Sequence, residues 1–273
     1  MTTRPSRVGQ LALPALAVVV AVALGGYAYR AAQDLGDPHF LTGYVLFGLM
    51  LGLVLLRGRK ALSVVPLGRA AFWLRVHVVG GFLGVIVFWL HTGALWPIGL
   101  YEQLIAGLFY FVSASGIFGY VVQRAYPSRL TQTGREIIYE RIPAAIAELR
   151  DAAEDVILEC GEKTGSDTLA KYYVETFEWF FRQPRFFASN AVGAARGAHW
   201  TRHHCGTVAR YLSSAEEPYL DKLADLLAAK VVIDTHYAAQ RIMKTWLWGH
   251  VPASMALIVL AIWHFLAVNA YAL

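Results

Sequence analysis

Long apolar segments are the feature that most constrains this chain. Hydrophobic residues make up 57% of its 273 residues, more than an ordinary soluble domain carries. A helix crosses the bilayer core with about 20 apolar residues. Five segments approach that length, at approximate residues 11–29, 40–56, 73–95, 104–122 and 246–270. The sequence therefore predicts an all-α membrane protein with five transmembrane helices.

The first apolar segment has the basic start of a secretory signal peptide, because Arg4 and Arg7 precede it. Its apolar run is longer than the core of a usual signal peptide, which has about 7–15 residues. We therefore expect this segment to remain in the mature protein as the first transmembrane helix.

Basic residues indicate how the predicted helices cross the membrane. Residues 1–123 and 246–273 contain eight basic and three acidic side chains, whereas segment 124–245 contains 16 of each, so the net charge of +5 lies in the membrane portion. The connection before the third apolar segment, RGRKALSVVPLGRAAFWLR, is basic, and the connection after it, TGALWPIGLYEQ, has no Lys or Arg. Cytoplasmic loops of membrane proteins are enriched in Lys and Arg. We therefore expect the N-terminus and segment 124–245 to be cytoplasmic and the C-terminus to lie outside.

The predicted transmembrane helices divide the chain into three parts. Transmembrane helices one to four occupy residues 1–123, a helical cytoplasmic insert occupies 124–245, and the fifth transmembrane helix occupies 246–273. The expected location is a bacterial-type inner (cytoplasmic) membrane, with lipid around the helices. Because topology explains the excess positive charge, no nucleic-acid partner is expected.

Two pairs of histidines lie in the predicted helices, where ionisable side chains are costly and commonly mark function. His77 and His91 fall in RVHVVGGFLGVIVFWLHTG, and His250 and His264 fall in WGHVPASMALIVLAIWHF, with fourteen residues between the members of each pair. Fourteen residues are just under four helical turns, so the members share one helix face and lie about 21 Å apart along its axis. One histidine of each pair is therefore expected near each membrane face.

Both histidine-bearing helices run from the cytoplasm to the outside in this topology. Side by side, they bring His77 to His250 near the cytoplasmic face and His91 to His264 near the outer face. Two opposed imidazoles are the axial ligands of a six-coordinate b-type haem. The sequence therefore predicts two haem b groups, each with its iron between one of these pairs. Gly84, seven residues from both His77 and His91, would leave room for a flat macrocycle.

The two histidine-bearing segments resemble the di-haem transmembrane cytochrome b family, which includes the cytochrome b of respiratory and photosynthetic cytochrome bc complexes. In that family, two parallel helices each donate two histidines at nearly this spacing. The resemblance implies that the four histidines ligate haem iron and that Arg75 meets a haem propionate. A chain of this kind would carry electrons across the membrane between a redox partner and a quinone or second partner, as the membrane subunit of a respiratory complex. The insert or the outer face would dock the partner.

The chain also departs from that family. Its ligand-bearing helices are the third and the fifth, with segment 124–245 between them, and the Pro-Glu-Trp-Tyr quinol-oxidation motif is absent. No CxxCH motif is present, so the haem would be held without covalent attachment. The two cysteines, Cys160 and Cys205, are too few for an iron–sulfur cluster.

Other functions stay open at this point. A self-contained quinone or ferric reductase would need its own substrate pocket, and no GxGxxG motif indicates a flavin or a nicotinamide. Tyr101 and Glu102 either exchange protons with a quinol or anchor the fourth helix at the interface. A non-redox membrane anchor would use the histidines only for helix packing. Histidine-based transport usually recruits carboxylates, which the third and fifth helices lack.

The insert is expected to be helical, with a helix stop near Gly161 and Gly165. An apolar stripe in it is more typical of a packing face than of a cofactor site; the stripe comprises Leu169, Tyr172, Tyr173, Phe177 and Phe180. His236 precedes His250 by another fourteen residues. A third haem or a metal would need a further ligand from the RHHCG region, which is expected to be a surface loop; the candidates are His199, His203, His204 and Cys205.

Overall fold

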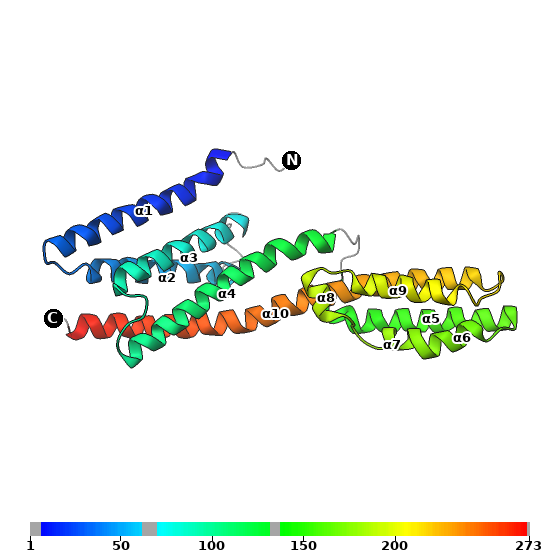
Figure 1. The fold of residues 1–273 in the computed structure, drawn as a ribbon. Helices are drawn as coiled ribbons and strands as arrows, with labels where there is room; N and C mark the ends of the chain where they lie inside the picture. Colours follow the sequence, from blue (N-terminus) through cyan, green and yellow to red (C-terminus); the bar gives the residue numbers. More distant parts are fainter. Residues whose placement is uncertain (1–6, 62–69, 132–136, 272–273) are drawn as a thin grey trace. The chain divides into compact units, whose positions relative to one another are not determined.

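The computed structural model describes residues 7–61, 70–131 and 137–271, and every regular element in these ranges is helical (Figure 1). The α-helices are α1 (Arg7–Gln33), α2 (His39–Ala61), α3 (Ala70–Thr92), α4 (Leu100–Thr131), α5 (Ile142–Thr164), α6 (Thr168–Tyr172), α7 (Glu178–Phe181), α8 (Phe187–Val192), α9 (Arg196–Val208) and α10 (Glu217–Tyr271). A 3-10 turn, η1 (Tyr139–Arg141), precedes α5, and a π-helical turn, η2 (Tyr173–Phe177), joins α6 to α7. The predicted all-α class is therefore confirmed.

The helices form two compact units. Unit 1 comprises Met1–Tyr120 and Leu247–Leu273, and unit 2 comprises Val121–Trp246. The helices α4 and α10 each contribute residues to both units.

Four helices are long and apolar enough to cross a bilayer: α1, α3, α4 and α10. Their apolar windows have mean hydropathies between 1.8 and 2.2. The apolar part of α2, His39–Val54, is shorter. Several long apolar helices of this kind are typical of a multi-pass membrane protein. The expected count of five spans stays a prediction.

Helix α1 contacts α3 along one face, which includes the partly buried Leu24, and exposes apolar side chains on the rest of its surface. Leu11 and Val22 are each more than two-thirds exposed, and none of the apolar window of α1 is buried within the protein. A helix whose outward faces are apolar needs an apolar environment on those faces. The outer surface of α1 is therefore suited to lipid.

The core of unit 1 lies among α2, α3, α4 and α10. Val87 and Phe88 of α3 pack with Phe109 of α4 and Leu257 of α10, all nearly or fully buried. The rings of Phe88 and Phe109 stack with their centres 4.3 Å apart. In sequence, Val87 lies between His77 and His91, and Leu257 lies between His250 and His264. The apolar core therefore joins the two helix segments that carry the histidine pairs.

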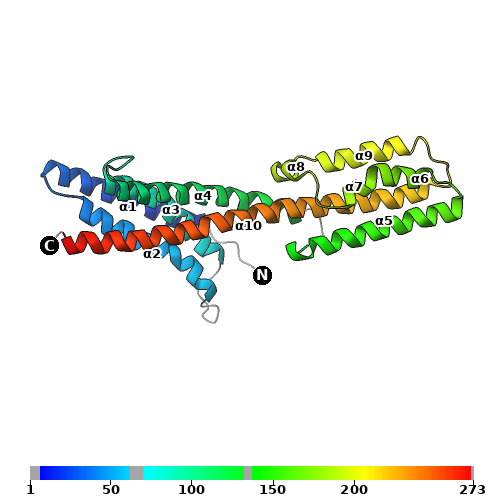
Figure 2. The ribbon, with the colours of Figure 1, turned by 90° about the horizontal axis from the view of Figure 1, so that it is seen from below.

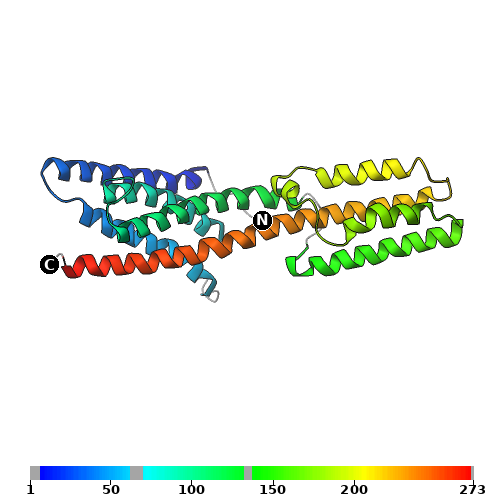
Figure 3. The ribbon, with the colours of Figure 1, turned by 60° about the horizontal axis from the view of Figure 1, so that its bottom comes forward.

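Helix α2 crosses the C-terminal part of α10 at an angle (Figures 2 and 3). At this crossing the rings of Phe47 and Phe265 stack with their centres 4.5 Å apart. The hydroxyl of Tyr44 donates a hydrogen bond to the side-chain oxygen of Asn269. Helix α2 therefore contacts α10 as well as α3, and this arrangement places it beside both histidine-bearing helices.

Unit 2 is built on an aromatic core. Phe177, Phe180 and Phe181 are almost completely buried and pack against Leu223 and Leu227 of α10. These phenylalanines belong to the α6–η2–α7 segment, whose apolar stripe is a packing face, as the sequence indicates. Helix α5 ends where the glycines predict, because Gly165 adopts a left-handed conformation with φ of 69° and its N–H donates to the carbonyl of Gly161 at 2.9 Å. Glycine favours that conformation because it has no Cβ.

The prediction of a surface loop around RHHCG is wrong. His199, His203, His204 and Cys205 all lie on the 13-residue helix α9, which packs Trp200, Cys205 and Val208 against the core of unit 2. For the wider stretch FFASNAVGAARGAHWTRHHCG the sequence indicates a loop or a broken helix, and the structure has the broken helix, α8 followed by α9. Gly193 does end α8, with φ of 80°, whereas Gly197 is buried against Phe186 and Val231 inside the packed unit. Packing on one face therefore outweighs the low helix propensity of glycine here.

One ion pair is fully enclosed in unit 2. The ammonium of Lys230 lies 2.6 Å from the carboxylate of Asp234, one turn further along α10, and both side chains are at most 2% exposed. Lys230 also donates to the carbonyl of Gln183 at 3.1 Å and lies over the ring of Phe180. Burial lowers the pKa of Lys230 and raises the pKa of Asp234 to about 6, while their mutual attraction acts in the opposite direction on both groups. Each charge therefore depends on the other to remain buried.

Replacing Lys230 with Met should strongly destabilise the protein. The substitution keeps the side-chain length but leaves the Asp234 carboxylate without its counter-charge. Breaking a buried pair in this way costs roughly 3–5 kcal/mol. Thermal and urea unfolding of the purified protein, followed by circular dichroism, measures the loss.

The double variant K230M/D234L is the matched comparison for K230M, because it removes both charges. We expect it to recover a large part of the lost stability, since apolar replacement of a whole buried pair is often close to neutral. Lys171 and Asp167 form an exposed pair of the same spacing, at 2.7 Å, so K171M should change the unfolding midpoint little. A K230M protein as stable as K171M would contradict the role given to the buried pair.

Candidate functional site

The structure brings together one of the histidine pairs that the sequence places at one depth. His91 of α3 and His264 of α10 lie with their ring centres 6.3 Å apart and their planes at 79°. The ring of Tyr101, from the first turn of α4, lies against His264 with a centre-to-centre distance of 6.1 Å. Three helices of unit 1 therefore meet at this pair.

A cavity of about 460 Å³ surrounds His91 and His264. Most of its lining is apolar and comes from α2, α3, α4 and α10. Besides the pair, the carboxylates of Asp37 and Glu102, the imidazole of His39 and the phenol of Tyr44 also line it. Its volume falls within the range of about 300–1,000 Å³ that is usual for small-molecule and cofactor pockets. The pair therefore opens onto a space large enough for a bound group.

His77 and His250 interact electrostatically with each other, so the second predicted pair is also near in space. The Nδ1 of His77 lies 3.1 Å from the carbonyl oxygen of Leu53 on α2. The Nδ1 of His250 lies 2.7 Å from the hydroxyl oxygen of Ser115 on α4. Each member of this pair is therefore held by a neighbouring helix.

These hydrogen bonds determine which ring nitrogen carries the proton. A carbonyl oxygen only accepts hydrogen bonds, so the Nδ1 of His77 must donate to Leu53. The Nδ1 of His91 donates in the same way to the carbonyl of His39, at 3.0 Å. A neutral imidazole protonated on Nδ1 carries its lone pair on Nε2, which is the atom that binds a metal. Both histidines of α3 are therefore in the tautomer that could bind a metal through Nε2.

His250 reaches the same tautomer through a hydroxyl group. The hydroxyl of Ser115 donates its single proton to the carbonyl of Val112, at 2.9 Å. The oxygen of Ser115 therefore accepts from the Nδ1 of His250, at 2.7 Å.

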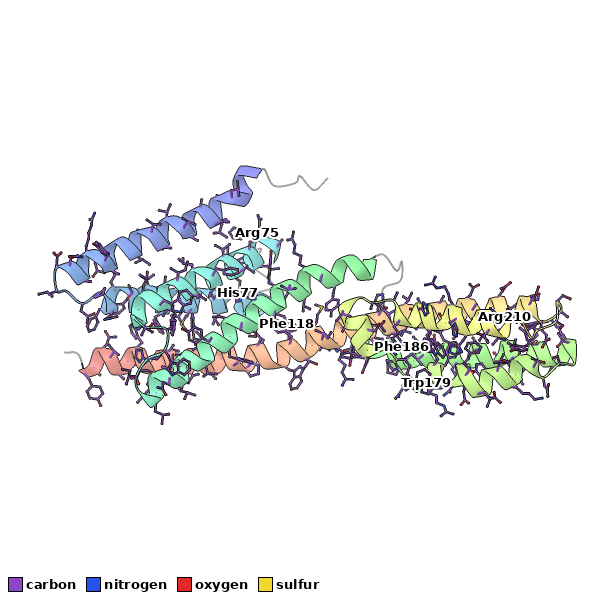
Figure 4. The ribbon with its side chains drawn as sticks, in the orientation of Figure 1. Arg75, His77, Phe118, Trp179, Phe186 and Arg210 are labelled. Atoms are coloured by element: carbon purple, nitrogen blue, oxygen red, sulfur yellow. The ribbon has the colours of Figure 1, made fainter. Side chains whose placement is uncertain are left out.

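Arg75 and Gly84, which the sequence also assigns to the site, lie on α3. Figure 4 labels Arg75 and His77 near the start of this helix. Arg75 is exposed, and its Nε donates to the carbonyl of Ala71 in the same helix at 3.4 Å. A Cβ on Gly84 would lie in ordinary contact, 3.7 Å, with Leu49 of α2. The propionate contact of Arg75 and the macrocycle contact of Gly84 stay predictions.

Sequence reasoning missed the residues of α2 that hold His91. The Nδ1 of His39 donates to the carbonyl of His91 at 2.5 Å, while the Nδ1 of His91 donates to the carbonyl of His39 at 3.0 Å. Gly43 makes room for the imidazole, because a Cβ there would lie 2.8 Å from the Cε1 of His91. His39 was the only one of the nine histidines without a predicted role, and its position at the start of an apolar helix was the available signal.

No protein-family model, curated protein or solved structure matches this chain. The resemblance to the di-haem cytochrome b family therefore rests on the four histidines and their spacing, and it stays a prediction. The chemistry available to the site follows from its own residues. In the described part of the chain, no group of three or more His, Cys, Asp or Glu side chains is placed to hold a metal ion.

The alternative metal site in the insert gains no support from the geometry. Burial raises the pKa of the Cys205 thiol to about 11, so this cysteine resists forming the thiolate that binds metals. Burial also lowers the pKa of His204, whose ring packs against Trp200 with centres 4.5 Å apart. His236 is almost completely buried in α10. These residues serve the packing of unit 2.

Replacing Gly43 with Ala should displace the imidazole of His91. A Cβ 2.8 Å from Cε1 is closer than real side chains approach, so the ring must shift and its hydrogen bond with the carbonyl of His39 weakens. Overpacking of this kind costs about 1–3 kcal/mol. The melting temperature of the detergent-solubilised protein measures this loss.

Gly48 provides the matched control, since it lies on the same helix and a Cβ there would meet nothing within 4 Å. G48A should hold or raise the melting temperature, because alanine is the better helix former by about 0.5–1 kcal/mol. If G43A melted no lower than G48A, the close contact between Gly43 and His91 would not be part of the folded protein.

Proposed function

We propose that this protein is a di-haem b-type cytochrome that carries electrons across a membrane. The observation that carries the proposal is the meeting of His91 and His264 from separate apolar helices at the wall of a 460 Å³ cavity. The same two helices carry a second pair, His77 and His250. His77 precedes His91 by fourteen residues, and His250 precedes His264 by the same number. The chain would thus hold two haem b groups, one between His91 and His264 and one between His77 and His250. These two pairs are called the two histidine levels below.

The donor atoms of the chain fit this group. Imidazoles that bind one metal ion from opposite sides, each at roughly 2 Å, have their ring centres about 6 Å apart. The 6.3 Å between His91 and His264 agrees with that spacing. Haem iron takes only its axial ligands from the protein, so two histidines suffice and a cluster of three protein ligands is not needed.

Protonation of the histidines also supports the proposal. His77 and His91 each donate from Nδ1 to a carbonyl of α2, which leaves Nε2 for iron, and the Nδ1 of His250 is engaged by the hydroxyl of Ser115. Histidines that only pack two helices together have no need of one shared tautomer. A second hydrogen-bond partner at Nδ1 is usual for histidines that ligate a metal through Nε2.

Haem supplies one-electron chemistry, while the residues of this chain bind it, exclude water and set its potential. The apolar core around Phe88, Phe109 and Leu257 excludes water between the two histidine levels. Those levels are about 21 Å apart along the helix axes. This distance places one centre near each side of a bilayer about 30 Å thick.

The proposed arrangement in the membrane has five spans, including α2. The N-terminus and residues 124–245 lie on the cytoplasmic side of a bacterial-type inner membrane, and the C-terminus lies outside. This orientation is supported by the basic residues before α3. The insert or the outer face would dock a redox partner subunit or electron carrier, and a quinone or second partner would exchange electrons at the opposite end.

Purified protein should contain two haem b per chain, and His91→Ala should remove one of them. The iron at His264 would lose one of its two axial ligands and its haem would bind weakly. His77 and His250 would still hold the other haem. A pyridine haemochrome assay and the reduced-minus-oxidised visible spectrum measure the content.

His203 is the control, because it is an exposed histidine on α9, away from both pairs in sequence. H203A should retain both haems. Colourless wild-type protein after purification with added haem would overturn the proposal in favour of a membrane anchor. Equal haem contents in H91A and H203A would overturn the assignment of His91 as a ligand.

A further inference from the structure

The neighbours of the four histidines repeat the spacing of the histidines themselves. On α2, the carbonyls that accept from His91 and His77 belong to His39 and Leu53, fourteen residues apart. On α4, the residues that contact His264 and His250 are Tyr101 and Ser115, again fourteen residues apart. Each histidine-bearing helix therefore has one flanking helix that touches both of its imidazoles.

We propose that α2 and α4 are positioning helices, which orient the imidazoles of α3 and α10 toward each other. This inference rests on the proposed function and assigns roles to residues outside the ligand set. His39, Gly43 and Ser115 are positioning residues in this scheme, since none of them is a ligand itself.

The direction of the chain explains why the spacings agree. Along α2 the order 39 then 53 meets 91 then 77 on α3, so the two helices run antiparallel. Along α4 the order 101 then 115 meets 264 then 250 on α10, which is also antiparallel. Neighbouring helices with the same rise per residue keep equal spacings at equal depths. One helix can therefore support both levels only if its own contacts recur at the spacing of the histidines.

On α2 the support is reciprocal at the His91 level. His39 and His91 each donate from Nδ1 to the carbonyl of the other, and Gly43 admits the His91 ring one turn further along. The rings of His39 and His91 have their centres 6.3 Å apart. Helix α2 thus holds the imidazole of His91 at Nδ1. The other ring nitrogen, Nε2, would then bind the iron.

On α4 the support for His250 comes from a side chain. The hydroxyl of Ser115 donates a hydrogen bond to the carbonyl of Val112 and accepts one from the Nδ1 of His250. A Cβ on the next residue, Gly116, would lie 3.7 Å from the Cε1 of His250. At the other level, Tyr101 lays its ring against His264 and donates its hydroxyl proton to the carbonyl of Leu260 at 2.8 Å. Because the acceptor for His250 is a hydroxyl, one substitution removes it.

The test is Ser115→Ala, with Ser113→Ala as the matched control on the same helix. Each substitution deletes one hydroxyl group from α4, but only Ser115 bonds to a candidate ligand. Loss of a partner that orients a metal-bound histidine typically weakens metal affinity 10–100-fold, so we expect the dissociation constant of one haem to rise by about that factor in S115A. Haem titration of the haem-depleted protein, followed at the Soret band, measures it.

Reduction potential is the readout that a purely structural role would leave unchanged. Without an acceptor at Nδ1, the imidazole of His250 is a poorer electron donor, and the ferric state of its iron loses stabilisation. We expect the midpoint potential of one haem to rise in S115A, while that of the other stays at the wild-type value. Ser115→Thr keeps the hydroxyl and should restore both the affinity and the potential.

If S115A matched S113A in both affinity and potential, the positioning role of α4 would be overturned. A wild-type protein that binds no haem would instead overturn the proposed function, so the two failures are distinguishable. A shift of both midpoint potentials in S115A would also overturn the inference, because Ser115 contacts only the His77–His250 level.

Discussion

An imidazole packed among apolar helices is costly to bury unless its ring nitrogens have hydrogen-bond partners. In unit 1, His77, His91 and His250 commit Nδ1 to an oxygen atom of a neighbouring helix. These bonds specify where α2 lies on α3 and where α4 lies on α10, because a shift by one residue along either helix would break them. In the proposed cytochrome, the same bonds would orient the imidazoles that hold haem. Helix packing and the proposed ligand chemistry would then depend on one set of contacts.

Unit 2 meets the same requirement with charges. The ammonium of Lys230 and the carboxylate of Asp234 are removed from solvent together, and the carbonyl of Gln183 accepts a further hydrogen bond from Lys230. The aromatic side chains around the pair, including Phe180, exclude water and strengthen its mutual attraction. Both units thus contain a polar group whose partners are set by the surrounding helices.

The sequence predicts features that local pattern controls. The all-α class, the end of α5 at Gly165 and the apolar stripe of α6–η2–α7 follow from composition, helix-stop signals and periodicity. Histidines are rare enough in apolar segments that two equal spacings indicate which helices meet. Gly43 and Ser115 were not predictable, because small residues are common in apolar helices and carry meaning only once the neighbouring helix is known. Lys230 and Asp234 resemble any exposed pair four residues apart on a helix. The helical state of α9 depends on packing that glycine content does not reveal.

The two flanking helices differ in how a substitution can affect them. Helix α2 supports His77 and His91 through main-chain carbonyls, which remain in place whatever side chains the helix carries. A change in the position of α2 would therefore move both imidazoles of α3 together and couple the two levels. Helix α4 supports His250 through the hydroxyl of Ser115 and approaches His264 through the ring of Tyr101, so its two contacts are chemically different and separately replaceable. Substitutions on α4 can therefore change the surroundings of one histidine pair without changing those of the other. The position of α2 instead affects both pairs together.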